Sequence, residues 1–261
     1  MTIYFDSTAR KVRDLPVSEA ERAARVQLAA CYRIFNHLGW TEMIFNHITL
    51  RVPGPRSDDP SLFLINPFGL HYSEITASSL VLIDVEGNPV REAKWPVNRA
   101  GFVIHSAIHE HVERAHCVMH THTTTGMAVA CQKEGLSPTN FYAAQLHGKV
   151  AYHDFEGITV EEGEKERLVT SVGGKRAVIL RNHGLLAWGP SVPEAFMMLW
   201  TLQRACDVQI AASSAGSLNP IREEVFAQTV RESGPGEKRT CEDVFAAMVR
   251  LVEAKDPSYR D

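Results

Sequence analysis

Two short histidine-bearing segments stand at the ends of apolar runs, where their side chains are placed to do chemistry. His120-Thr121-His122 follows the apolar run 115–119, and Asn182-His183-Gly184 follows the apolar run 177–180. Both runs are typical of buried strands. Because residues i and i+2 of an extended strand point to the same side, His120 and His122 can hold one ion together.

His183, arriving from a second strand end, would complete a three-histidine site with open coordination positions. Such a set is typical of a catalytic divalent metal and not of a closed structural site. Zinc is the first choice, with manganese, iron or cobalt as alternatives. Gly184 is expected to give the backbone the freedom to turn there. Chance remains an alternative reading of the His120/His122 pair alone, since the chain has 12 histidines.

Two further histidines, His105 and His109, are four residues apart on a predicted helix and therefore share one face. They do not belong to a metalloprotease-type HExxH motif, because Ser106 stands where that motif has glutamate. We expect His105 to lie in the pocket wall or behind the metal ligands, with a catalytic role as one possibility. His109 is expected to be structural.

The elements that position these residues follow from capping signals and periodicity. Ser18 and Glu21 form a capping box that opens a helix, and Gly39 ends it. Strands are expected over 48–52, 62–65, 80–85, 115–119, 150–152 and 177–180, and helices over 100–111, 124–131, 161–171, 191–215 and 242–254. This order predicts an α/β fold with a largely antiparallel sheet.

We expect one domain over 1–261, with a core over 19–216 and a loose arm over 1–17. A C-terminal part over 217–261 would consist of a loop, reaching to about residue 240, and a final helix. The net charge of −4 argues against a general nucleic-acid binder. The chain has no apolar stretch of membrane-spanning length and no signal-peptide core, so we expect a cytoplasmic protein without a membrane partner. Its five scattered cysteines are expected to be reduced.

With these residues in place, the chain resembles the class II aldolase/adducin family over roughly 19–216. It is most similar to adducin-head-like members of bacterial type, related to fuculose-phosphate aldolase. The matching stretches, in order, are 39–40, 46–49, 65–70, 72–76, 82–87, 96–101, 120–122, 181–184 and 194–196. The resemblance implies a three-layer αβα sandwich, a metal held by His120, His122 and His183, and a homotetramer with active sites at subunit interfaces.

The same resemblance implies a reaction in which the metal polarises substrate oxygens and stabilises an enediolate. Family aldolases place an acidic residue four positions before the histidine that corresponds to His105, but this chain has Gly101 there. Glycine cannot take a proton. Asn98 and Arg99 are candidate substrate contacts near this point, and a helix N-cap with a solvated charge is an equally good interpretation of them.

The region that binds phosphate in the family aldolases is also altered. Asn46 is the best-matched residue there, and Gly69 is a further candidate for substrate binding. Bulky Phe45 and Phe68 favour a less polar substrate than a phosphate ester, although aromatic residues at such positions also serve as core. Tyr259 is a candidate proton donor to a neighbouring subunit, as in related aldolases, with a frayed, solvated tail as the alternative.

These features predict a metal-dependent carbon–carbon lyase acting on a small hydroxy-carbonyl or carboxylate substrate through an enolate. Aldol cleavage and decarboxylation are both open, and decarboxylation tolerates the loss of the acid/base best, because carbon dioxide leaves without prior removal of a C–H proton. The alternative is a non-catalytic, adducin-like module of the actin-cytoskeleton type. A relic that binds metal without turnover is the third possibility.

Overall fold

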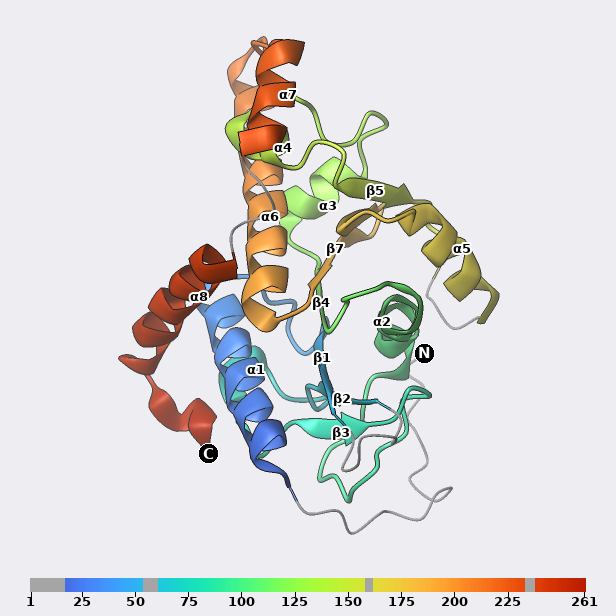
Figure 1. Cartoon of the computed structure of the whole chain (residues 1–261), viewed down its shortest axis with the longest axis vertical. Helices are drawn as coiled ribbons and strands as arrows, with labels where there is room; N and C mark the ends of the chain where they lie inside the picture. Colours follow the sequence, from blue (N-terminus) through green and yellow to red (C-terminus); the bar gives the residue numbers. More distant parts are fainter. Residues whose placement is uncertain (1–16, 54–60, 158–161, 233–237) are drawn as a thin grey trace.

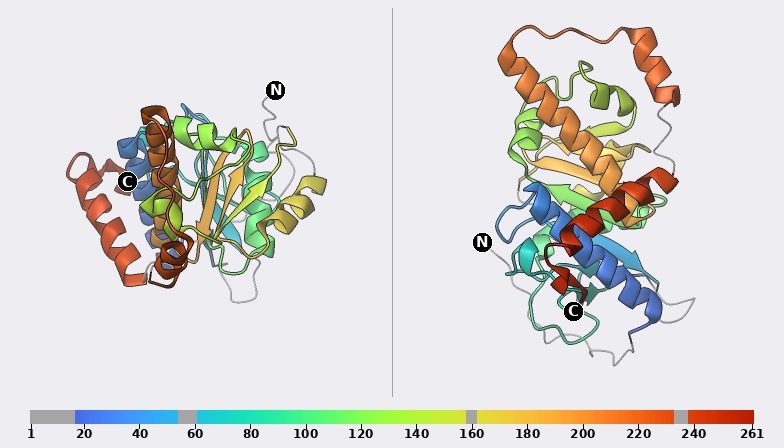
Figure 2. Two further views of the ribbon diagram at one scale, coloured as in Figure 1. Left: turned by 90° about the horizontal axis from the view of Figure 1, so that it is seen from above. Right: turned by 90° about the vertical axis from the view of Figure 1, so that its left-hand side faces the viewer.

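The computed structural model describes residues 17–53, 61–157, 162–232 and 238–261. These residues form a three-layer αβα sandwich, with one mixed sheet between two layers of helices (Figures 1 and 2). The predicted fold class is therefore confirmed.

The sheet of the described residues has seven strands in the order β3-β2-β1-β4-β7-β6-β5. The strands are β1 (Ile48–Val52), β2 (Leu62–Ile65), β3 (Val81–Ile83), β4 (Cys117–Thr121), β5 (Val150–His153), β6 (Ala177–Leu180) and β7 (Gly184–Gly189). Every neighbouring pair is antiparallel except β5 and β6. Central β4 pairs Met119 with Ile48 of β1 and His120 with Leu186 of β7, so the histidine segment lies in the middle of the sheet.

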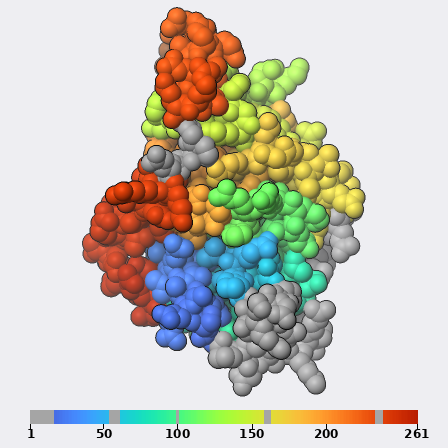
Figure 3. Space-filling view, viewed as in Figure 1, coloured from blue at the N-terminus to red at the C-terminus, as the bar shows by residue number. Residues whose placement is uncertain are grey.

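Helices cover the two faces of the sheet unequally. One face carries α2 (Arg99–His111) and α5 (Glu162–Val172). The other face carries α1 (Glu19–Leu38), η1 (Tyr72–Glu74), α3 (Thr124–Ala130), α4 (Phe141–Gln145), α6 (Val192–Ala215), α8 (Lys238–Glu253) and η2 (Pro257–Arg260). A further helix, α7 (Glu223–Glu232), packs against α4 at the end of the molecule that lies uppermost in Figure 3. None of the described helices is long and apolar enough to cross a membrane.

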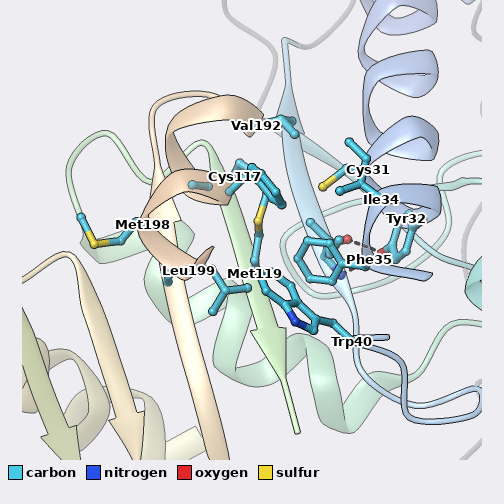
Figure 4. Close-up of a cluster of buried hydrophobic side chains, with 14 of the residues drawn as sticks. Cys31, Tyr32, Ile34, Phe35, Trp40, Cys117, Met119, Val192, Met198 and Leu199 are labelled. Atoms are coloured by element: carbon cyan, nitrogen blue, oxygen red, sulfur yellow. Dashed lines mark hydrogen bonds between the residues drawn. The ribbon is translucent and has the colours of Figure 1, made fainter. Parts of the chain in front are cut away.

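The alternation of β4 sets which side chains reach which face. Cys117 and Met119 join the large core formed with α1 and α6 (Figure 4), whereas Val118 packs with the α2 and α5 side. His120 has the parity of Val118, so its ring lies on the α2 side. The larger core is continuous, and burying a side chain such as Met119 in it stabilises the fold by about 2 kcal/mol.

The first helix follows its sequence signals closely. Ser18 accepts a hydrogen bond from the Glu21 backbone at 3.1 Å, which satisfies one free N–H of the first turn and contributes about 1 kcal/mol. Gly39 ends α1 in the left-handed conformation with φ 73°. The helix then packs beside α8 and η2, which are close to it in all views (Figures 1 and 2).

Three parts of the chain differ from the sequence expectation. Strand β7 (Gly184–Gly189) was not predicted, although its run is apolar throughout and bounded by glycines, as is typical of a buried strand. The expected loop before residue 240 contains α7, whose Phe226 packs edge-on against the His147 ring. Residues Pro257–Arg260 form a short 3₁₀ helix in which Tyr259 is buried. The interpretation of this segment as a frayed, solvated tail is therefore wrong.

Candidate metal centre

Three histidines converge where β4 and β6 end. His120 is in β4, His122 follows directly, and His183 lies in the turn from β6 to β7. One ring nitrogen from each lies within 4.8 Å of the others, and the Nε2 atoms of His120 and His122 are 2.7 Å apart. The strand geometry expected from residues i and i+2 thus brings these rings together.

The orientation of His120 is fixed by the backbone of the neighbouring strand. Its Nδ1–H donates to the Leu185 carbonyl at 2.9 Å, because a carbonyl oxygen can only accept. Nε2 therefore carries the free lone pair and faces the other two histidines. A hydrogen bond of this kind holds a metal-binding imidazole in the required tautomer.

All three rings are kept neutral by their surroundings. Burial lowers the pKa of His183 to about 4, and the neighbouring His122 adds to this effect. Burial also lowers the pKa of His122, and burial together with the adjacent histidines lowers that of His120 well below its usual value. Neutral imidazoles are the form that binds a metal, so near neutral pH no proton has to be removed first.

Gly184 is required beside this cluster for a reason other than the one expected. Its φ lies outside the left-handed region, whereas Asn182 takes a left-handed φ of 57°. A Cβ on Gly184 would lie 2.4 Å from the Thr121 carbonyl oxygen and 3.3 Å from Cε1 of His120. The glycine therefore allows two backbones and two imidazoles to approach closely, rather than allowing a turn.

These residues fit a divalent metal ion. Two neutral Nε2 atoms at 2.7 Å repel each other through their lone pairs unless a proton or a cation lies between them. A cation satisfies all three nitrogens at once, and three imidazoles leave further coordination positions open. Among the described residues, no thiolate or carboxylate joins the cluster.

Behind the cluster lies a second set of histidines, which hydrogen-bond to one threonine. The Thr49 hydroxyl is 2.7 Å from His105 Nδ1 and 2.7 Å from His109 Nε2. His109 Nδ1–H donates to the Ala115 carbonyl at 2.6 Å, so its Nε2 accepts from Thr49, and Thr49 in turn accepts from His105. His105 thus sits in the wall behind the triad, with its Nε2 as an unpartnered acceptor among the described residues.

His47 links these two sets, and from the sequence it was assigned no role. Its ring centroid is 4.2 Å from that of His105 and 5.9 Å from that of His120. Burial lowers the pKa of His47 to about 3, against a smaller opposite effect of the Gly101 backbone. The available signal was the alternation of polar His47 and Thr49 on one side of an otherwise apolar strand, facing His105 on its helix.

His47 also explains the glycine at position 101. A Cβ there would lie 2.1 Å from Cε1 and 2.5 Å from Nδ1 of His47. Real Cβ atoms do not approach other atoms so closely, so any side chain at this position would displace the ring. The imidazole of His47 thus fills the space in which an acidic side chain at position 101 would begin.

The predicted substrate contacts have different environments. Asn46 is buried with a left-handed φ of 66°, and its Oδ1 has no hydrogen-bond partner among the described residues. Asn98 is the N-cap residue of α2 but makes no side-chain capping bond. Gly69 is exposed in the turn after β2. A Cβ added to it would lie 3.7 Å from the Trp95 ring. The side chain of Arg99 lies outside the described part of the chain.

The aromatic residues expected near the substrate have two different environments. Phe68 is buried, whereas Phe45 is 40% exposed, with their ring centroids 6.3 Å apart. Tyr259 is fully buried in the core on the α1 side of the sheet, the face opposite His120. It does not contribute to the histidine cluster of its own chain, and its burial argues against a mobile proton donor.

Comparison with known proteins agrees with this architecture. Residues 26–210 match the family model described as the class II aldolase and adducin N-terminal domain. The chain belongs to the class II aldolase and adducin family. This confirms the resemblance derived from the motifs, and the family relationship supports an aldolase-type function.

Members of the class II aldolase and adducin family with quite different names are similar to this chain. A Pseudomonas aeruginosa protein, provisionally named an aldolase class 2 protein, is 41% identical over 94% of both chains. Alpha-adducin of Rattus norvegicus is 42% identical over 84% of this chain, which corresponds to only 30% of the adducin. The structure of L-fuculose 1-phosphate aldolase from Glaciozyma antarctica superposes with a TM-score of 0.80, at 29% identity and 97% coverage of both chains.

Proposed function

We propose that this protein is a metal-dependent carbon–carbon lyase that acts on a small hydroxy-carbonyl or carboxylate substrate. The observation that carries the proposal is the convergence of three neutral imidazole nitrogens within 4.8 Å, with His120 oriented by the Leu185 carbonyl. We further propose zinc as the ion and a homotetramer as the assembly. A divalent ion held there would act as a Lewis acid that polarises a substrate carbonyl.

The residues of the chain divide the remaining work between them. His120, His122 and His183 would hold the ion, and their low pKa values keep them available for it. His105, held by Thr49, supports the wall behind them. Buried Asn46, whose amide oxygen has no hydrogen-bond partner among the described residues, would orient a substrate hydroxyl.

The absence of a side chain at Gly101 bears on which bond is broken. Aldol cleavage needs a group that accepts a hydroxyl proton, whereas decarboxylation loses carbon dioxide without removing a proton first. The space of a carboxylate at position 101 is filled by the His47 ring, which burial keeps neutral. Within the lyase class, this substitution favours decarboxylation of an oxo acid over cleavage of a sugar phosphate.

Product analysis with defined metal content tests the proposal. The protein would be stripped with a chelator, reloaded separately with zinc, manganese, iron and cobalt, and incubated with a panel of hydroxy-carbonyl compounds and β-oxo acids. We expect carbon–carbon cleavage, followed by NMR of the products, only with reloaded wild-type protein and not with His183→Ala. A fully loaded wild-type protein that converts nothing in the panel would contradict the proposal.

The second candidate is a non-catalytic module of adducin type. The 42% identity to alpha-adducin over 84% of this chain favours it, since that similarity is as high as to the aldolase-named relative. Co-sedimentation with actin filaments at physiological salt, with the triad variant His183→Ala in parallel, separates the two. Binding that is equal for both proteins, together with no turnover, would support the module over the lyase.

A further inference from the structure

Five histidine rings form the surroundings of the candidate metal position, without a counter-charge among the described residues. They are His47, His105, His120, His122 and His183, which lie in contact with one another as neighbouring rings. The charges that act on these rings come from other histidines, and no described carboxylate is among them. A divalent ion in this cluster would keep both of its positive charges uncompensated by the protein.

Uncompensated charge in a buried site has a large electrostatic cost, which an anionic ligand removes. In many metal sites an aspartate or glutamate supplies part of that compensation. Here the described residues of the chain offer only neutral ligands, so an anionic substrate would supply negative charge that the chain does not. A neutral hydroxy-ketone would leave the imbalance in place, whereas a carboxylate would offset it.

In His47 both ring nitrogens are buried, and the Gly101 backbone is the protein group that acts most directly on them. Nδ1 and Nε2 are buried, and neither makes a well-formed hydrogen bond among the described residues. His120 and His109 differ, because carbonyl oxygens fix their tautomers. His47 is therefore free to turn an N–H toward a ligand, and a buried donor without a partner costs stability unless a ligand uses it.

We propose that the substrate of this site is a small oxo or hydroxy acid whose carboxylate accepts a hydrogen bond from His47. The inference rests on the proposed function only in that a divalent ion occupies the triad. His47 and Gly101 form a matched pair in this arrangement, because the ring can stay beside the triad only while position 101 has no side chain. A hydrogen bond from an imidazole to a carboxylate is of the charge-assisted, stronger kind.

The test uses two probes that differ at one group. Pyruvate and hydroxyacetone share a methyl ketone and differ in carboxylate against hydroxymethyl. The full-length protein would be loaded with cobalt(II), and each probe titrated in while the visible cobalt absorption is followed. We expect wild-type protein to bind pyruvate at least about tenfold more tightly than hydroxyacetone.

Variants on both sides of the matched pair check the role of His47. His47→Leu replaces the imidazole by a side chain of similar size that has no N–H. Gly101→Ala keeps the His47 imidazole but displaces it from its position beside the triad. Each variant should lower the affinity for pyruvate about tenfold and leave the affinity for cobalt within about threefold of wild type. His47→Asn, which keeps an N–H donor, should retain part of the pyruvate affinity. His116→Asn, a change of an exposed histidine, is the matched control and should bind as wild type.

The outcomes separate this inference from the proposed function. If cobalt does not bind wild-type protein at the triad, both are overturned. If cobalt binds but pyruvate is not preferred, or if His47→Leu and Gly101→Ala both bind pyruvate as wild type, the carboxylate inference alone is overturned. If one variant fails to fold, the other, together with His47→Asn, still decides the question.

Discussion

The histidines of this protein fall into two groups that differ in what their nitrogens face. In the inner group, His105 and His109 are tied to the Thr49 hydroxyl, and His109 also donates to the Ala115 carbonyl. In the outer group, His120, His122 and His183 turn their nitrogens toward one another. Both groups are largely buried, so burial alone does not distinguish a structural from a ligand-binding histidine.

The difference shows what a buried imidazole needs. A folded protein pairs nearly all of its buried polar atoms, and the inner group follows this rule through Thr49. In the outer group only His120 Nδ1 is paired with a backbone carbonyl, and the nitrogens that face one another suit a shared cation. His47 lies between the two groups, and neither of its buried nitrogens makes a well-formed hydrogen bond among the described residues, which is why we propose it as a substrate contact.

Removing a ligand of the outer group should have the largest effect. His183→Ala or His122→Ala should lower metal affinity by more than about hundredfold, because even indirect support of a metal ligand is worth about 10- to 100-fold. Isothermal titration with zinc measures this, with the exposed His116→Asn as control. Retained affinity in both triad variants would mean that the metal binds elsewhere.

A substitution in the inner group should lower the stability of the fold and leave metal binding nearly unchanged. Thr49→Val leaves the His105 Nδ1–H and the His109 Nε2 unpaired in the core, so we expect a loss of about 2–4 kcal/mol in the free energy of unfolding. Urea denaturation measures the change, and zinc affinity should stay within about threefold. Thr49→Ser, which keeps the hydroxyl, should recover most of the loss.

Thr201→Val is a matched control for that experiment. Thr201 is also a buried threonine, but its hydroxyl donates to the Met197 carbonyl of its own helix. Its loss leaves no donor unpaired, so the cost should be under about 1 kcal/mol. An equal loss in the free energy of unfolding for Thr49→Val and Thr201→Val would show that the hydrogen bonds of Thr49 to the two histidines add no further stability.

The pH dependence of stability follows from the inner group as well. Burial lowers the pKa of His109 to about 3 from the ordinary 6.5, so between these values the unfolded chain binds a proton that the folded chain does not. The stability of the metal-free protein should therefore be complete above pH 6.5 and fall by about 1.4 kcal/mol per pH unit below it for this histidine alone. Urea midpoints from pH 7 to 5 should show a steeper fall in wild type than in His109→Gln; a flat profile would refute the neutral, buried assignment.

The smallest effect is expected at Tyr259, which belongs to neither group. Its hydroxyl is buried without a well-formed hydrogen bond, and Arg260 stacks on the ring 5.3 Å from its centroid. Tyr259→Phe should change the free energy of unfolding by less than about 1 kcal/mol and leave metal affinity and any turnover unchanged. Loss of turnover with an intact fold would instead restore Tyr259 as a proton donor.

The outer group could be predicted from sequence because the geometry of its first two members is local. His120 and His122 share one strand side by the two-residue period, whereas His183 follows β6, two strands away from β4, and was assigned because it too ends an apolar run and matches a family motif. The first helix and the β1–β2 pair could be predicted for the same reason, since caps and alternation lie within a few residues. The family motifs then connected these parts into one fold.

The matched pair of His47 and Gly101 could not be predicted in this way. The two positions are far apart in the chain and meet only when α2 packs on β1, and neither position has a spacing that indicates the contact. Tyr259 was misjudged because its burial depends on η2 docking beside η1, where the Ala77 N–H donates to the Tyr259 carbonyl at 2.8 Å. Such packing contacts have no local signal.

Anomalous diffraction at the zinc edge, from crystals of the full-length protein grown with zinc, tests the metal centre most directly. We predict one peak per chain, about 2.0–2.1 Å from one ring nitrogen each of His120, His122 and His183. A peak bound by other residues, or no peak at the triad despite excess zinc, would contradict the account.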